Sequence, residues 1–228
     1  MEIYHTLNRG VDKRTIFLDD QDRFRFVHDL FEFNDREPSG KNSQRIFAKN
    51  MPNVSDFASR TIKHRKRKLL VDILAFCLMD NHYHLLLAPR VKDGIVKFMR
   101  KLNIGYAKYF NEKYKRSGAL FQGRYKSILV QEQAHFIHLP YYIHLNPLDM
   151  FAPEWRRRRI KNYEKSIRLL KSYRWSSFLD YMGERNFSSV TSRSFLLKLF
   201  GGSASYLSET ADWLKNLDLE EIKPLLLE

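Results

Sequence analysis

The sequence predicts an α+β fold: a ferredoxin-like antiparallel sheet in the order βαββαβ, with an added helix after it. The first observation is a hairpin, because two β-rich apolar runs, residues 69–79 and 82–87, are joined by the tight turn Asp80-Asn81. The second is that a helical pattern lies on each side of this hairpin, at about residues 20–31 and 92–115. Shorter extended stretches begin and end the series, as the split βαβ arrangement requires.

Each element has a local signal. Residues 3–8 alternate weakly and end at the turn Asn8-Arg9-Gly10, which predicts a strand. Asp19-Asp20 supplies acidic residues for the start of the first helix. Gly118 ends the long second helix, and residues 119–130 are expected to form the last strand. The added helix runs to about Leu145, where Pro147 stops it, and residues 163–172 and 191–215 are also expected to be helical, with residues 173–183 connecting them.

Composition restricts the class of protein. The chain has 228 residues, of which 43% are hydrophobic, so it can bury a core. The single cysteine, Cys77, excludes an internal disulfide framework and a multi-cysteine zinc module. No apolar run reaches the roughly 18 residues of a membrane span, and the first residues lack the features of a signal peptide. We therefore expect a cytoplasmic protein.

The formal net charge is +14, and the excess is gathered in three runs, at residues 60–68, 97–126 and 155–174. One such run is often only a solvated face, but three of them favour nucleic acid as the partner. The last stretch, residues 208–228, is acidic instead. We expect a catalytic domain over residues 1–150 with an insert at about 35–68, followed by a mostly helical C-terminal extension, 151–228, that is first basic and then acidic.

The sharpest local feature is His82-Tyr83-His84. Residues i and i+2 of a strand point to the same face, so both imidazoles can reach one divalent ion while Tyr83 points toward packing. Taken alone, the pattern is more typical of two polar residues on a solvated strand face.

A second motif, Tyr142 to Pro147, supplies the context. Tyr142 and Asn146 share a helix face, so an Asn146 oxygen could be a third ligand with the Tyr142 hydroxyl one turn away. Two imidazoles and an amide oxygen suit Mg²⁺ or Mn²⁺ acting on a phosphate. The same motif could also be the end of a core helix.

Five ordered blocks together resemble a known family, the REP-associated tyrosine transposases within the HUH single-tyrosine transposases. The blocks are YHTLNRGVDKRTIFL (4–18), MDNHYHLLL (79–87), GALFQGRYK (118–126), YIHLNP (142–147) and YRWSSFLDYMG (173–183). The resemblance implies that His82 and His84 are metal ligands, that Asn146 is the amide ligand and that Tyr142 is the nucleophile. It also implies a metal-dependent endonuclease and strand transferase that cleaves single-stranded DNA beside a hairpin, through a 5′-phosphotyrosine.

Basic and aromatic side chains that interleave suit contacts to single strands, with Tyr114, Phe121 and Tyr125 as rings that could stack on bases. The expected DNA contacts are Asn8, Arg9, Lys115, Arg116, Gln122, Arg124, Tyr125, Lys126, Arg156, Arg157, Arg158 and Arg159. A histidine-triad hydrolase is disfavoured because position 86 is Leu86. A domesticated, non-catalytic protein that only binds hairpins or single strands stays open, as does the choice between monomer and homodimer.

Overall fold

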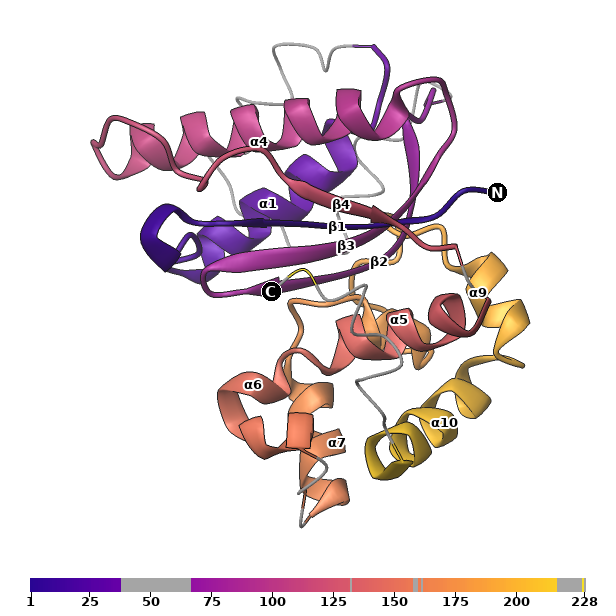
Figure 1. Ribbon diagram of the computed structural model, residues 1–228. Coiled ribbons are helices and arrows are strands. Elements are labelled where there is room, and N and C mark those ends of the chain that lie inside the picture. Colours follow the sequence, from indigo (N-terminus) through magenta and orange to yellow (C-terminus); the bar gives the residue numbers. More distant parts are fainter. Residues whose placement is uncertain (38–66, 132, 158–159, 161, 217–226, 228) are drawn as a thin grey trace.

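The computed structural model of the protein describes residues 1–37, 67–131, 133–157, 160, 162–216 and 227. These residues form a four-stranded antiparallel sheet between two layers of helices (Figure 1). The strand order is β2-β3-β1-β4, with β1 Tyr4–Arg9, β2 Val71–Met79, β3 His82–Pro89 and β4 Lys126–Leu129. With α1 Asp20–Glu32 and α4 Gly94–Lys113, the chain order is βαββαβ, so the ferredoxin-like prediction is confirmed.

The helices α1 and α4 form the upper layer in Figure 1 and bury the apolar stripes that the sequence predicts. The side chain of Asp19 caps α1 by accepting a hydrogen bond from the Asp22 amide. The predicted insert at about 35–68 lies mostly outside the described residues. Its two ends meet, because the Arg36 amide donates to the Lys68 carbonyl and the side chain of Asn34 bonds to both Leu70 and Val71.

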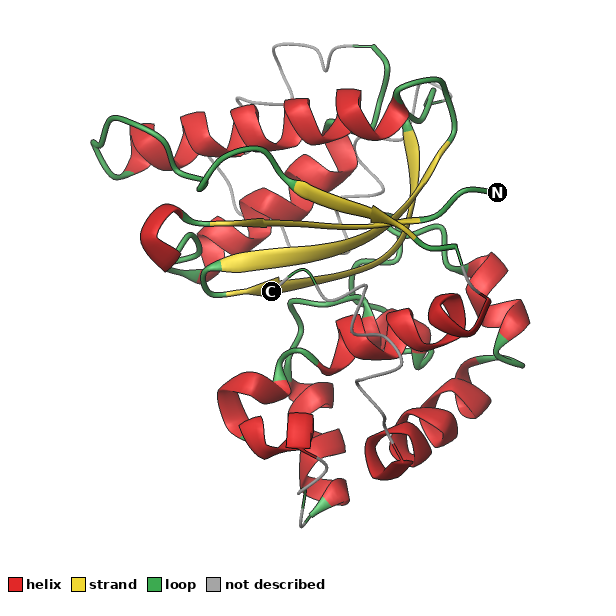
Figure 2. Cartoon of the chain, viewed as in Figure 1, coloured by secondary structure: helices red, strands yellow, loops and turns green. Residues whose placement is uncertain are grey.

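The other face of the sheet carries the remaining helices (Figure 2). The helix α5, Gln133–Leu145, packs on β2 and β3 and continues through Pro140. It is followed by α6 Leu148–Phe151, the 3₁₀ turn η2 Pro153–Arg157, α7 Tyr163–Ser172, α8 Phe178–Tyr181, α9 Ser194–Leu199 and α10 Ser203–Asn216. Residues 175–177 pair with the outer edge of β2, through bonds of Leu78 and Phe76 to Trp175 and Ser177, so this part of the sheet edge is covered.

Aromatic contacts tie the C-terminal helices to α5. Tyr141 stacks on Tyr206 at 4.7 Å between ring centroids, and its hydroxyl donates to Glu209. Buried His144 bonds to the Tyr206 hydroxyl and to Ser177 Oγ, each at 2.7 Å, and burial lowers its pKa to about 3. His144 is therefore a neutral structural residue. The boundary predicted at residue 150 stays a prediction.

Three elements differ from the sequence-based expectation. The last strand is only Lys126–Leu129, because residues 120–122 make just single bonds to Val11 and Arg9 before the chain turns at Gly123. The helix expected over 191–215 is divided by Gly201 and Gly202, whose φ angles of 71° and 101° end α9. The connecting chain 173–183 contains the short helix α8. Among the described residues, no helix has both the length and the apolar character needed to cross a membrane.

The buried carboxylate of Asp22 links α1 to α4, and its contribution to stability can be tested by mutation. Its carboxylate accepts from Lys113 Nζ at 2.7 Å and from the hydroxyls of Tyr109 and Tyr114. We expect Asp22→Asn to lower the free energy of unfolding by about 2–3 kcal/mol, because the hydrogen-bonded ion pair loses its charge. The control Asp20→Asn, at a side chain that is 70% exposed, should cost less than about 1 kcal/mol. Urea unfolding measures both; equal losses would contradict the assignment.

Candidate active site and nucleic-acid interface

The two histidines of β3 lie side by side on the face of the sheet that α5 covers. Their ring centroids are 4.9 Å apart. Tyr83 points to the opposite face, where it packs on Phe26 and its hydroxyl donates to Asn103. The alternation of the strand therefore places these three side chains as the sequence predicts, and the metal-binding role of the histidines stays a prediction.

Hydrogen bonds orient both imidazoles. His82 Nδ1 lies 2.6 Å from Asn81 Oδ1, and His84 Nδ1 lies 3.0 Å from His5 Nε2. His5 comes from β1, where antiparallel pairing places it diagonally across from His84 on the same face. Because Asn81 Oδ1 can only accept, His82 carries its proton on Nδ1 and its lone pair on Nε2. Neighbours that fix the tautomer in this way are typical of histidines that bind metals.

The ring of Tyr142 contacts His84 and His5 edge-on. Its ring centroid is 5.9 Å from that of His84 and 6.3 Å from that of His5, and the side chain is fully buried. Tyr141 is turned to the C-terminal helices instead, where burial and the Glu209 carboxylate raise its pKa. The helix α5 thus separates the two neighbouring tyrosines: Tyr142 contacts the histidines with its ring, and Tyr141 contacts the C-terminal helices.

Asn146, just beyond the end of α5, stays on the same side as Tyr142. Its Nδ2 donates to the Tyr142 carbonyl at 2.9 Å, and its Oδ1 accepts from Arg156 Nη2 at 3.1 Å. Arg156 Nη1 is also 3.4 Å from the Tyr142 hydroxyl. The structure therefore brings together Tyr142 and Asn146, as predicted from their spacing, and adds Arg156 to them.

The imidazole nitrogens of His82 and His84 and the amide oxygen of Asn146 are atoms of the kinds that bind divalent ions. No group of three His, Cys, Asp or Glu side chains in the described part of the chain could hold a metal. Within the described residues, a third protein ligand beside His82 and His84 would therefore be of another type. The amide oxygen of Asn146, turned toward the Tyr142 side, is such a donor, and imidazole with amide oxygen suits Mn²⁺ or Mg²⁺.

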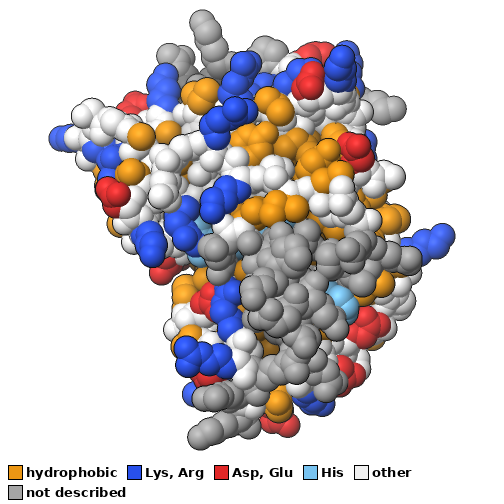
Figure 3. Space-filling model, in the orientation of Figure 1, with side chains coloured by type: hydrophobic (Ala, Val, Ile, Leu, Met, Phe, Trp, Pro, Cys, Tyr) orange, Lys and Arg blue, Asp and Glu red, His pale blue; other side chains and the backbone are white. Residues whose placement is uncertain are grey.

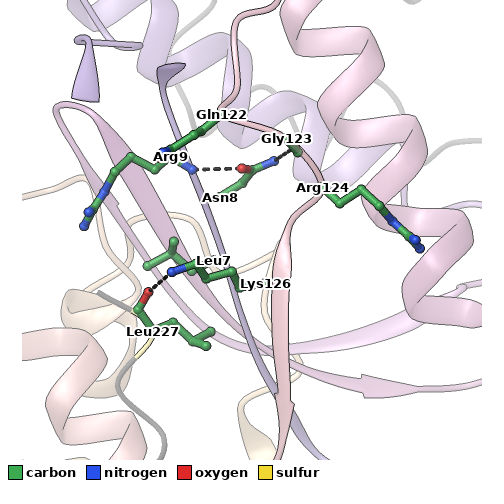
Figure 4. A pocket seen from close by; sticks show the side chains of 8 residues that line it. All are labelled: Leu7, Asn8, Arg9, Gln122, Gly123, Arg124, Lys126 and Leu227. Carbon is green, nitrogen blue, oxygen red and sulfur yellow. Dashed lines mark hydrogen bonds between the residues drawn. The ribbon is translucent and has the colours of Figure 1, made fainter. Parts of the chain in front are cut away.

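A cavity of about 130 Å³ opens beside the histidines, between β1 and the loop that leads into β4 (Figure 4). The cavity is linked to the histidine pair through Arg9, which lines it and pairs with His82 across the strands. Five of the predicted DNA contacts meet here with three other lining residues: Leu7, Asn8, Arg9, Gln122, Gly123, Arg124, Lys126 and Leu227. Arg9 and Arg124 extend to opposite sides of the cavity, and Lys126 donates to the Leu227 carbonyl at 3.1 Å.

The tight turn after β1 fixes the position of Arg9. The Gly10 amide donates to the Asn81 carbonyl at 2.8 Å, which joins this turn to the β2–β3 hairpin beside His82. A Cβ at Gly10 would lie 2.3 Å from the Arg14 carbonyl oxygen, so no larger residue fits. Figure 3 shows lysine and arginine side chains gathered on the left of the molecule, at the end of the sheet where this turn lies.

The other predicted DNA contacts are less concentrated. Lys115 and Arg116 lie in the loop after α4, where Arg116 bonds to Asn111 and to the Ala119 carbonyl. Tyr125 is half-buried next to the cavity and Arg157 is exposed, whereas Arg158 and Arg159 are outside the described residues.

Two of the rings proposed for stacking on bases are packed in the hydrophobic core instead. Phe121 is buried against Tyr83 and Tyr106, and Tyr114 packs on Phe110 and bonds to Asp22.

Two residues of the site, His5 and Asp149, are not among those that the sequence predicts. His5 carried a weak signal, because it alternates with Leu7 and Arg9 on a strand that was itself predicted. Asp149 carried no signal, since its bonds to Trp155 and Arg156 depend on how the chain turns after α5.

The chain is similar to one known protein family and, distantly, to solved structures. The family model described as "Transposase IS200 like" matches residues 40–146. Among solved structures, the chain is similar to a REP-associated tyrosine transposase bound to a REP hairpin, with a TM-score of 0.44 and 11% sequence identity over 80% of this chain and 79% of that one. A likeness this distant assigns no function to the chain. No curated protein matches it.

The matched segment contains the histidine pair, Tyr142 and Asn146. The family model therefore supports the resemblance seen in the sequence over residues 40–146, just under half of the chain.

Proposed function

We propose that the protein is a metal-dependent single-strand DNA endonuclease and strand transferase that cleaves beside DNA hairpins. The observation that carries the proposal is the buried cluster of Tyr142, His84 and His82, in which the tyrosine ring contacts His84 and His84 contacts His82. The proposal is supported by the position of these residues within 40–146, the segment that the IS200-like transposase model matches. A tyrosine hydroxyl is a nucleophile, and a histidine pair with an amide oxygen is a metal-binding set.

The chemistry assigns one role to each side chain. Tyr142 Oη attacks the scissile phosphorus, the bond to the 3′ oxygen breaks, and that oxygen leaves as a 3′-hydroxyl after taking up the proton that the phenol loses. The 5′ end stays joined to Tyr142 as a phosphotyrosine, so a second 3′-hydroxyl can displace it without ATP. His82, His84 and Asn146 would hold Mg²⁺ or Mn²⁺. Such an ion withdraws negative charge from the phosphate when it is bound.

We place the single-stranded DNA in the cavity that is lined by Arg9 and Lys126. Arg9 and Lys126 place two positive charges next to the proposed reaction centre, and Asn8 and Gln122 add polar groups that can bond to phosphate or to base edges. Backbone contacts of this kind fix the register of a nucleic acid without reading its sequence. Single-stranded or hairpin DNA is therefore the proposed partner.

One observation favours a second function, a protein that binds hairpins without cleaving them. Tyr142 and Asn146 are fully buried, so DNA can reach the hydroxyl only after neighbouring groups move. A domesticated transposase that keeps the closed arrangement would bind DNA through the cavity alone.

The first prediction concerns the nucleophile. With labelled single-stranded hairpin DNA from the flanks of the gene, we expect a covalent protein–DNA adduct in Mn²⁺ or Mg²⁺, none in EDTA and none with Tyr142→Phe. Tyr141→Phe is the matched control and should form the adduct, because that hydroxyl faces away from the histidines. Denaturing gel electrophoresis measures the adduct. Survival of the adduct in Tyr142→Phe would move the nucleophile elsewhere, and binding without any adduct would support the second function.

The second prediction concerns His5. We expect His5→Phe, which keeps a ring of similar size, to weaken Mn²⁺ binding by about 10–100-fold, because His84 loses the partner that orients it. His138→Phe, on the outer side of α5 where His138 bonds to Trp213, is the control. Titration calorimetry or Mn²⁺ electron paramagnetic resonance measures the affinity. An unchanged affinity in His5→Phe would show that this bond does not tune the site.

The third prediction concerns the cavity. Lys126→Met should weaken single-strand binding to a similar extent for every sequence, and should reduce the slope of log affinity against log salt by about 0.7, as expected for one lost phosphate contact. Lys92→Met removes an equal charge at the opposite end of β3 and should leave the slope unchanged. Fluorescence anisotropy at several salt concentrations measures both. Equal slopes in the two variants would place the DNA elsewhere.

A further inference from the structure

The segment after α5 folds back over the Tyr142 side chain. Trp155 and Arg156, both in η2, lie against its ring, with centroids 6.2 Å apart for the two aromatic rings and 5.5 Å between the guanidinium carbon and the ring of Tyr142. Trp155 is 1% exposed. These contacts join residues that are more than ten positions apart, so they are features of the tertiary structure rather than of one helix.

Asp149 anchors this segment. Its Oδ1 accepts from Trp155 Nε1 at 2.6 Å and from Arg156 Nε at 2.7 Å, and its Oδ2 accepts from Arg156 Nη2 at 2.6 Å. The two bonds to Arg156 form the bidentate pairing of a carboxylate with a guanidinium, which fixes the plane of the guanidinium group as well as its position.

The nitrogens of the anchored guanidinium also reach the reaction centre. Nη1 lies 3.4 Å from the Tyr142 hydroxyl and Nη2 lies 3.1 Å from Asn146 Oδ1. Asn146 in turn donates to the Tyr142 carbonyl, which closes a ring of bonds through the two residues. One fixed cation thus contacts both the proposed nucleophile and the proposed amide ligand.

We propose that Arg156 is a positioning residue for strand cleavage: held by Asp149, it sets the orientation of the Tyr142 hydroxyl and of the Asn146 amide. This inference rests on the proposed function, since it gives Arg156 a role in the reaction of Tyr142. It differs from the phosphate contact expected from the sequence, because a phosphate-binding arginine acts on DNA affinity and a positioning arginine acts on the rate.

The geometry of the groups supports a positioning role. A guanidinium has five N–H donors in one plane and stays charged, so it can hold Asp149, Tyr142 and Asn146 at once. A carbonyl oxygen has two lone pairs, so Asn146 Oδ1 can keep its bond to Arg156 while it meets a second partner. A displacement of about 1 Å in a reacting group can cost about 100-fold in rate.

The experiment separates rate from affinity. For wild type, Arg156→Met, Arg156→Lys and Asp149→Asn, we would measure the rate of adduct formation at saturating hairpin DNA with Mn²⁺ and, separately, the DNA dissociation constant. Arg156→Met should lower the saturating rate about 100-fold and change the dissociation constant less than about threefold. Arg156→Lys, which keeps the charge but lacks the fork, should recover part of the rate, and Asp149→Asn should lie between the two. Arg185→Met, at an exposed arginine in the loop after α8, controls for loss of charge.

Each other outcome has a defined meaning. A weaker dissociation constant with a normal saturating rate would make Arg156 a phosphate contact and overturn the inference. A faster rate in Arg156→Met would show that Arg156 holds the site closed, which also overturns it, as would an unchanged rate. Wild-type protein without any adduct would refute the proposed function itself. Thermal melting accompanies each variant, and if Arg156→Met does not fold, the rates of Arg156→Lys and Asp149→Asn decide the question.

Discussion

The arrangement of the site depends on the pairing of β1 with β3. In this register Leu7 faces His84, Arg9 faces His82, and His5 reaches His84 by a 3.0 Å contact between ring nitrogens. A shift of one residue would turn His5 and Arg9 to the face covered by α1 and α4. The Gly10–Asn81 hydrogen bond and the tight turn at Gly10 hold this register at the end of the sheet where the histidines lie.

The site also depends on the orientation in which α5 packs on the sheet. His144 bonds to both Ser177 and Tyr206, and Tyr141 stacks between aromatic rings of the C-terminal helices. These contacts lie on one side of the helix, so Tyr142 is turned to the other side, toward His84. The C-terminal helices therefore have a structural role in orienting the proposed nucleophile, even though none of them contributes a proposed reacting group.

Charge in the site is compensated by tertiary contacts. Arg156 is paired with Asp149, and this pair is in contact with Tyr142 through a hydrogen bond and through the ring face. Arg9 and Lys126 instead line the cavity where a strand would enter. Basic side chains that the sequence groups together as DNA contacts thus have two different surroundings, the buried cluster around Tyr142 and the cavity beside β1. The first suits orientation and the second suits electrostatic attraction of phosphates.

The sequence by itself determined the fold class, the hairpin, the shared face of His82 and His84 and the pairing of Tyr142 with Asn146, because each depends on a local period of two or of 3.6 residues. Five ordered blocks also give the resemblance to a transposase family, and the model of IS200-like transposases matches residues 40–146. Only the tertiary structure decided that His5 orients His84, that Phe121 belongs to the core and that Arg156 meets Tyr142. These contacts join distant segments, and no local pattern records which side chains meet when strands pair and the chain folds back over α5.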